Sequence, residues 1–145
     1  MSLSNIFQIS SQGMTSQRER LETASANLAN ANTTRTAEGG AYRRRDVIFE
    51  AASFQDLSAS IDSEDESALP GVRTKLFISE AGNGIKRYQP EHPDADAAGF
   101  VTMPDINPLE ETVNVLSAAR AFEANATVFN TAKELMRATL KLSEA

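Results

Sequence analysis

One short stretch of the chain carries side chains that could do chemistry. Glu91, His92 and Asp94 place an imidazole between two carboxylates, beside Pro93. Such a group could transfer a proton or help to hold a metal ion. His92 is, however, the one histidine of the chain, and no cysteine is present to complete a soft metal site. A single histidine in a turn bounded by proline is more often structural, and we expect no catalytic or metal-binding role for His92.

The glycine and serine residues also lack a catalytic setting. Gly39-Gly40 and Gly82-Asn83-Gly84 have neither the lysine nor the hydroxyl residue of a phosphate-binding loop. Serine is frequent, but no serine lies in the sequence context of a nucleophile elbow. We therefore predict that the protein is not an enzyme and that it has no catalytic, cofactor-binding or metal-binding residue, no cofactor and no small-molecule substrate.

The charge balance also limits the partners. The 145 residues carry a net charge of −6, and the one basic run is Arg43, Arg44 and Arg45. Nucleic acids bind basic surfaces, so this composition argues against them as partners.

The first fifteen residues lack the basic start and long apolar run of a cleaved signal peptide, and no stretch approaches the ~20 apolar residues of a membrane span. If the protein leaves the cytosol, we expect it to use another route.

The two ends of the chain have helical patterns. Large apolar residues recur every seven residues over about 3–31 and again over about 109–145, with Pro108 at the first turn of the second segment. A seven-residue repeat gives a narrow apolar seam that another helix must cover. We predict that the two helices pair in a coiled coil. The first series is Phe7, Met14, Leu21 and Leu28, and it should face Val115, Phe122, Phe129 and Met136.

The middle of the chain has β patterns. Strands are predicted at residues 42–50, 72–78 and 100–103, and the alternation in 72–78 predicts a half-buried strand. Residues 85–89 should pair back on 72–78 in a hairpin through Gly82-Asn83-Gly84. The predicted fold class is mainly α with a small β insert: a helical domain from 1–34 and 107–145, a flexible connector at 35–45, and a β-rich region at 46–106 with a mobile acidic loop at 54–70.

The predicted core is thin for this length. Aromatic residues make up 6% of the chain, tryptophan is absent, and many apolar residues are alanine. The helical seams therefore need more partner surface than one chain supplies, as in an assembly subunit. Asn27, Asn30 and Thr33 cluster near the end of the first helix. They either fix a polar turn or form hydrogen bonds across a packed interface.

Several stretches match one known family. Residues 25–33, Ser-Ala-Asn-Leu-Ala-Asn-Ala-Asn-Thr, resemble the N-terminal signature of bacterial flagellar rod, hook and hook-associated proteins. Residues 42–49, 90–104 and 119–125 resemble, in turn, the first strand, the segment before the last helix and the last helix of the proximal-rod subunits within that family. The resemblance runs almost end to end and is interrupted chiefly around residues 54–70.

The resemblance implies a function. The family's subunits pass unfolded through the flagellar type III export apparatus without signal cleavage. They polymerise into the periplasmic proximal rod of the basal body, a drive shaft that transmits motor torque to the distal rod and hook. Expected partners are further copies and the rod proteins FlgB, FlgF, FlgG and FliE. The terminal helices should form the inner domain and the β region should face outward. The assembly contacts expected on this basis are Phe7, Met14, Leu21, Asn27, Leu28, Asn30, Thr33, Val115, Phe122, Phe129 and Met136.

A rival interpretation is a cytosolic helical adaptor or export chaperone, which would share the acidity and the seven-residue repeats. Such a chaperone would fold stably alone and would not need the Asn-Leu-Ala-Asn sequence. A small hydrolase that uses His92 is a third and remote alternative.

Overall fold

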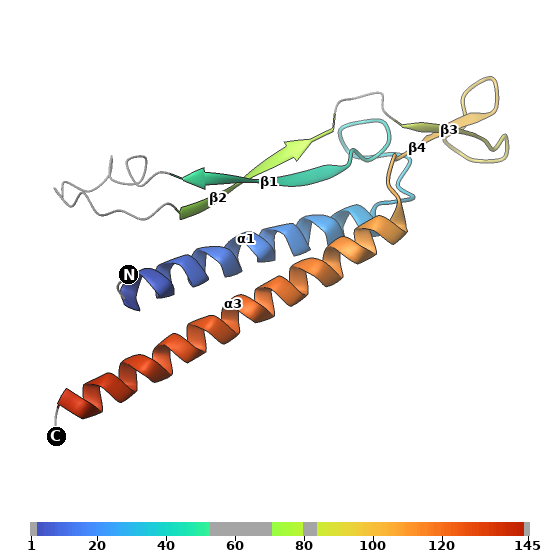
Figure 1. The fold of residues 1–145 in the computed structure, drawn as a ribbon. Helices are drawn as coiled ribbons and strands as arrows, with labels where there is room; N and C mark the ends of the chain where they lie inside the picture. Colours follow the sequence, from blue (N-terminus) through green and yellow to red (C-terminus); the bar gives the residue numbers. More distant parts are fainter. Residues whose placement is uncertain (1–2, 53–70, 80–83, 144–145) are drawn as a thin grey trace. The chain divides into compact units, whose positions relative to one another are not determined.

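The computed structural model describes residues 3–52, 71–79 and 84–143 (Figure 1). The described chain has a long helix at each end and short strands between them, so a mainly helical fold with a small β region is confirmed. The elements are α1 (Leu3–Ala29), β1 (Arg45–Ala52), β2 (Gly71–Ile78), β3 (Ile85–Tyr88), β4 (Phe100–Met103) and α3 (Pro108–Ser143). Within these described ranges, neither helix is long and apolar enough to span a membrane. The coiled-coil form of the helix pairing stays a prediction.

Side-chain hydrogen bonds cap the C-terminal end of α1 and the N-terminal end of α3. At the end of α1, the Asn30 amide donates to the carbonyl of Ala26 at 2.8 Å, and the Thr33 hydroxyl donates to Asn30 Oδ1 at 3.2 Å. Before α3, the Asn107 side chain accepts the backbone N–H of Leu109 at 3.1 Å. Pro108 is the first residue of α3, as predicted, because a proline there gives up only an N–H that the helix would leave unpaired.

The strands form two separate two-stranded sheets, β1 with β2 and β3 with β4. In the second sheet, Ile85 lies opposite Met103 and Tyr88 opposite Phe100 in an antiparallel register. The predicted pairing of residues 85–89 with 72–78 is therefore wrong. The segment after β3 turns back sharply because Asp96 Oδ1 accepts two backbone N–H groups and Gly99 has a φ of 81°. The predicted turn at Gly82-Asn83 and the whole of the acidic loop at 54–70 lie outside the described residues.

The prediction of a half-buried β2 is also wrong. Of the expected inward series, Val72, Leu76 and Ile78 are exposed, and Thr74 is half-buried. The contacts that hold β2 are polar: the Val72 N–H donates to Gln12 Oε1 at 3.2 Å, and the Thr74 hydroxyl bonds to the Glu19 carboxylate. A two-stranded sheet has no neighbouring strands to cover its side chains, so its apolar residues stay accessible.

The chain divides into two compact units. The first unit consists of Met1–Glu19, Ile48–Lys75 and Ala118–Ala145, and the second consists of Arg20–Val47 and Leu76–Ser117. Each unit therefore contains a part of α1, of α3 and of the β1–β2 sheet, and the second unit also contains β3 and β4. The predicted separation of a helical domain from a β-rich region remains a prediction.

Candidate assembly site

The expected assembly residues differ widely in burial. Asn27 is fully buried, with 1% of its surface exposed. Leu28, Phe122 and Met136 are exposed, with 38% of the Leu28 surface accessible. The remaining expected residues are half-buried: Phe7, Met14, Leu21, Asn30, Thr33, Val115 and Phe129.

Besides Ser16 and Asn27, the buried residues of the terminal segments follow a second heptad series, three residues after the large apolar one. On the N-terminal segment these residues are Ser10, Ala24 and Ala31, and on α3 they are Glu111, Ala118 and Ala132. They are small or polar, whereas the predicted series is large and apolar. The single chain therefore buries small or polar heptad side chains and leaves part of the large apolar series accessible.

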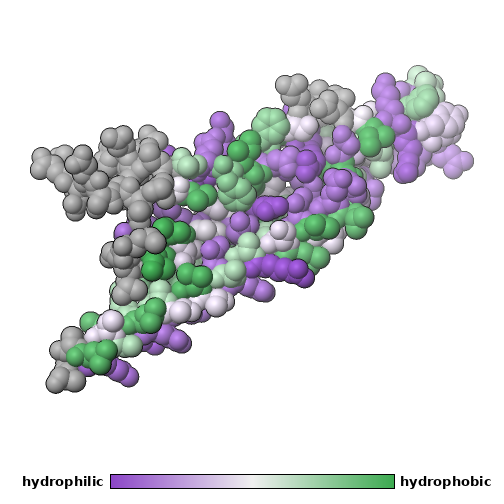
Figure 2. All heavy atoms as spheres, in the orientation of Figure 1, coloured by the Kyte–Doolittle hydropathy of each residue, from purple (hydrophilic) through white to green (hydrophobic). Residues whose placement is uncertain are grey.

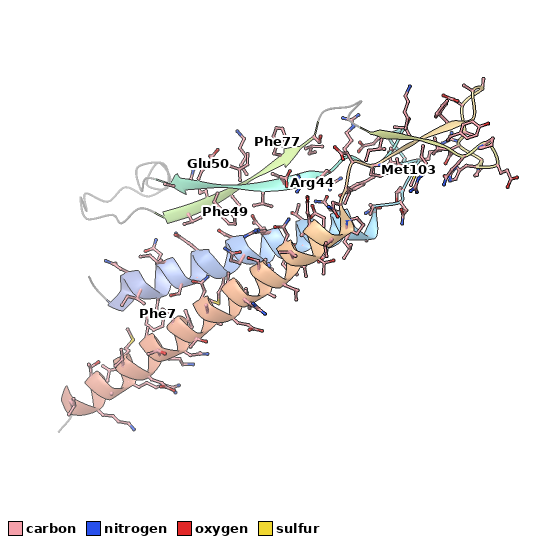
Figure 3. All side chains as sticks on the ribbon, turned by 45° about the vertical axis from the view of Figure 1, so that its right-hand side comes forward. Phe7, Arg44, Phe49, Glu50, Phe77 and Met103 are labelled. Atoms are coloured by element: carbon pink, nitrogen blue, oxygen red, sulfur yellow. The ribbon has the colours of Figure 1, made fainter. Side chains whose placement is uncertain are left out.

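In the first unit, α1 contacts α3 at Phe7 and at Gly13. The rings of Phe7 and Phe129 pack edge to face, with centroids 4.9 Å apart, and Figure 3 shows Phe7 on the side of α1 that faces α3. A Cβ added at Gly13 would lie 2.9 Å from the Asn125 side-chain nitrogen. Gly13 therefore leaves room for the Asn125 side chain at this point of the helix pair.

In the second unit, the side chain of Asn27 joins α1 to β1 and α3. Asn27 Oδ1 accepts the backbone N–H of Arg45 at 3.0 Å and the Tyr42 hydroxyl at 3.3 Å. Its Nδ2 donates to the Arg45 carbonyl at 2.7 Å and to Glu111 Oε2 at 3.3 Å. The amide thus uses both donors and both acceptor sites, as a buried polar group requires.

The Glu111 carboxylate is the charged centre of this cluster and is 1% exposed. Its Oε1 accepts the Arg44 Nε–H at 2.9 Å, and the Arg44 guanidinium also pairs with Asp46 at 2.9 Å. Figure 3 shows Arg44 at the start of β1. A buried carboxylate is tolerated when a guanidinium and an amide bond to it directly, and both are present here.

The cluster shifts two pKa values. Burial raises the pKa of the Tyr42 phenol above its ordinary value of 10.0, the charge of Arg45 works against this shift, and Glu111 adds to it. For Arg44, burial acts to lower the pKa, but the hydrogen bond to Glu111 and the nearby carboxylates outweigh it, so the pKa of Arg44 is raised. Both side chains therefore keep their protons at neutral pH.

A polar hollow of about 620 Å³ lies beside the cluster in the second unit. Arg43, Arg44, Asp46, Asp105 and Glu110 contribute both signs of charge to its lining. No group of three or more histidine, cysteine, aspartate or glutamate residues suited to a metal ion occurs among the described residues. The hollow therefore does not have the donor set of a metal site.

The His92 stretch forms a turn in the second unit. His92 Nδ1 accepts the backbone N–H of Asp94 at 3.1 Å. The Asp94 carboxylate accepts the Thr34 hydroxyl at 2.7 Å and lies 3.8 Å from the Arg35 guanidinium. These contacts fix the turn around His92 and Asp94, and the absence of a catalytic role for His92 stays a prediction.

Sequence reasoning did not find Tyr42, Arg44 and Glu111 as parts of this site. In the sequence, Arg44 belongs to a run of three arginines and Glu111, three residues after Pro108, to a pair of glutamates, and neither pattern indicates a buried ion pair. The one signal in the sequence for this site was the group of polar residues near the Asn-rich end of the first helix. For Asn27, Asn30 and Thr33, the hydrogen bonds described are within the chain and fix the helix end and the start of β1.

Apolar side chains remain exposed along α3. In the second unit Leu109, Val113 and Leu116 follow one another at helical spacing, and Leu109 is 72% exposed. In the first unit Val128, Leu135 and Leu142 are exposed at intervals of seven residues. Figure 2 shows hydrophobic side chains along this C-terminal part of α3. Exposed apolar residues in a regular row indicate a surface that binds another protein.

The sequence was compared with known proteins. Residues 7–35 match the family "Flagella basal body rod protein", and residues 97–142 match "Flagellar basal body rod FlgEFG protein C-terminal". The chain is 36% identical to the flagellar basal-body rod protein FlgC of Borreliella burgdorferi over 98% of both chains. It is 35% identical to the Escherichia coli protein of that name, over 99% of this chain and all of the relative. For the Bacillus subtilis protein the identity is 33%, over 94% of this chain and 95% of the relative.

Proposed function

Because this chain belongs to the family of flagellar basal-body rod proteins, and is a structural subunit of that rod rather than an enzyme, we propose that the exposed apolar row of α3 is its contact with neighbouring subunits. In the first unit this row is formed by Val128, Leu135 and Leu142. The observation that carries the proposal is that α3 buries Ala118 and Ala132 and leaves this row of larger apolar residues accessible.

The heptad spacing supports a helical partner. Three large apolar residues at intervals of seven lie along one narrow line of α3, and a line of this kind is covered best by another helix. Leu28 on α1 and Phe122 and Met136 on α3 are also accessible, so the large heptad series of both helices can contribute to contacts between subunits.

The neighbours are further copies of this chain and the rod proteins FlgB, FlgF, FlgG and FliE, and the assembled rod lies in the periplasm and transmits torque to the hook. The chain reaches the rod through the flagellar type III export apparatus without signal cleavage. The terminal helices pair as a coiled coil in an inner domain, and the β region faces outward. The thin core supports this account, because helices that lack partner surface can be unfolded for export and ordered by their neighbours.

Photo-crosslinking in cells tests the proposal. A crosslinking amino acid is placed at Leu135, in a strain whose own copy of the gene is deleted, and basal bodies are isolated after illumination. Leu135 should give adducts with a second copy or another rod protein. The same amino acid at Ala37, an exposed residue of the turn before Gly39, should give far fewer adducts. Intact basal bodies without Leu135 adducts would contradict the proposed contact.

A further inference from the structure

In the first unit, the rings of Phe7 and Phe129 and the fit of Asn125 beside Gly13 specify how α1 and α3 align. In the second unit, the residues buried near Asn27 are small: Ala24 on α1 and Ala31 just after it. Small residues fit one another at more than one alignment, so their packing in this unit selects a register weakly.

One buried pair breaks this uniformity. Asn27 and Glu111 are both 1% exposed, and the Asn27 amide donates to Glu111 Oε2 at 3.3 Å. A slip of seven residues would separate Glu111 from Asn27 and would leave a buried carboxylate short of a hydrogen-bond donor. An uncompensated buried charge costs several kcal/mol, whereas a slipped pair of small apolar residues costs little.

We propose that Glu111 is the specificity-determining residue that sets the register of α1 against α3 in the second unit. Its contribution is selective: it disfavours the slipped alignments and adds little to the stability of the correct one. Single buried polar residues fix alignment in this way in paired helices, at a cost in stability. The inference rests on contacts within one chain and does not depend on rod assembly.

The surroundings of Glu111 allow a clean substitution. Asn27 keeps three hydrogen bonds without Glu111, two to the backbone of Arg45 and one to Tyr42. Arg44 keeps its ion pair with Asp46. Glu111→Leu therefore removes the buried charge without leaving either partner alone, and places an apolar side chain in the seam. The neighbouring Glu110→Leu is the matched control, because Glu110 is exposed.

Cysteine crosslinking of the purified full-length chain tests the proposal, since the chain has no cysteine of its own. Arg20 Nη2 lies 3.0 Å from Asn114 Oδ1, so Arg20→Cys with Asn114→Cys reports the native register. Arg20→Cys with Ala121→Cys reports a slip of seven residues. Each pair is treated with a short bismaleimide in chains with Glu111, with Glu111→Leu or with Glu110→Leu.

In Glu111→Leu, the ratio of slipped to native crosslinking should rise at least about tenfold, because the slipped state no longer buries an unpaired carboxylate. The ratio in Glu110→Leu should match that of the chain with Glu111. An unchanged ratio in Glu111→Leu would overturn the proposal. A loss of helix in that variant by circular dichroism would overturn it too, since it would show that Glu111 is needed for the fold itself.

Discussion

Asn27 binds the backbone of Arg45 through both polar atoms of its side-chain amide: Oδ1 accepts the N–H at 3.0 Å and Nδ2 donates to the carbonyl at 2.7 Å. A neighbouring strand would make the same two bonds, so a helix side chain takes the place of a strand partner at the first residue of β1. Asn27 lies in the stretch that resembles the N-terminal signature of the flagellar family. This contact gives that asparagine a physical role, because neither aspartate nor alanine offers a donor and an acceptor in this geometry.

Asn27→Asp should destabilise the folded chain strongly. The new carboxylate loses the donor to the Arg45 carbonyl and faces the buried carboxylate of Glu111. We expect the free energy of unfolding to fall by about 3 kcal/mol, because the buried Glu111 carboxylate loses the hydrogen bond from Asn27 and meets a second negative charge. Chemical denaturation followed by circular dichroism measures this change. Asn32→Asp, at an exposed asparagine five residues further on, is the control, and equal losses in the two variants would contradict the role given to Asn27.

The raised pKa of Tyr42 predicts that the folded chain loses stability at alkaline pH. Burial raises the pKa of its phenol above 10.0, so the folded chain holds this proton more tightly than the unfolded chain does. Stability from this group is complete below pH 10 and is lost as the pH rises through the higher pKa of the folded state. Tyr42→Phe removes one hydrogen bond to Asn27 and should cost about 1 kcal/mol at pH 7.

The measurement is the free energy of unfolding of both proteins between pH 7 and pH 11. The difference between them should narrow above pH 10, because the phenylalanine variant lacks the titrating group, while Tyr88 is common to both. A constant difference over this range would show that Tyr42 titrates alike in the folded and unfolded chains.

Gly13 and Asn125 should show coupled effects on stability. Alanine is a better helix former than glycine by about 1 kcal/mol, but a Cβ at position 13 would lie 2.9 Å from the Asn125 side-chain nitrogen. Gly13→Ala alone should therefore gain little. In an Asn125→Ala background the same substitution should gain the full amount of about 1 kcal/mol. A double-mutant cycle by chemical denaturation measures the coupling, and strictly additive changes would contradict the contact.

The sequence predicted the elements better than their partners. The seven-residue repeats located both helices, and alternation and turn residues located β1, β2 and β4, because these signals are local. The pairing of β3 depends on the turn that Asp96 and Gly99 make after it, so a hairpin with β2 was the wrong choice. The repeats predict large apolar residues along the seam, and that full series of contacts stays a prediction; within one chain Phe7 packs on Phe129, while Ala24 and Ala118 are buried more deeply. The roles of Arg44 and Glu111 could not be predicted, because they depend on a contact between residues 67 positions apart.

A substitution at Leu28 can test subunit assembly separately from the folding of one chain. It follows the buried Asn27 directly, yet 38% of its surface is exposed. Leu28→Asp should therefore leave the isolated chain folded, with a loss of at most about 1 kcal/mol from the new charge near the helix end. In the rod, the same carboxylate would be buried against a neighbouring subunit at a cost of several kcal/mol, and this cost recurs at every copy.

Cells that carry Leu28→Asp should make and export the protein but fail to build rods, and they should not swim. Ala37→Asp is the matched control, because Ala37 is exposed in a turn and its substitution should leave swimming intact. Isolated basal bodies and swimming assays measure both outcomes. Normal rods in Leu28→Asp cells would show that this face of α1 makes no subunit contact, while the stability of the isolated variant would separate that result from a failure to fold.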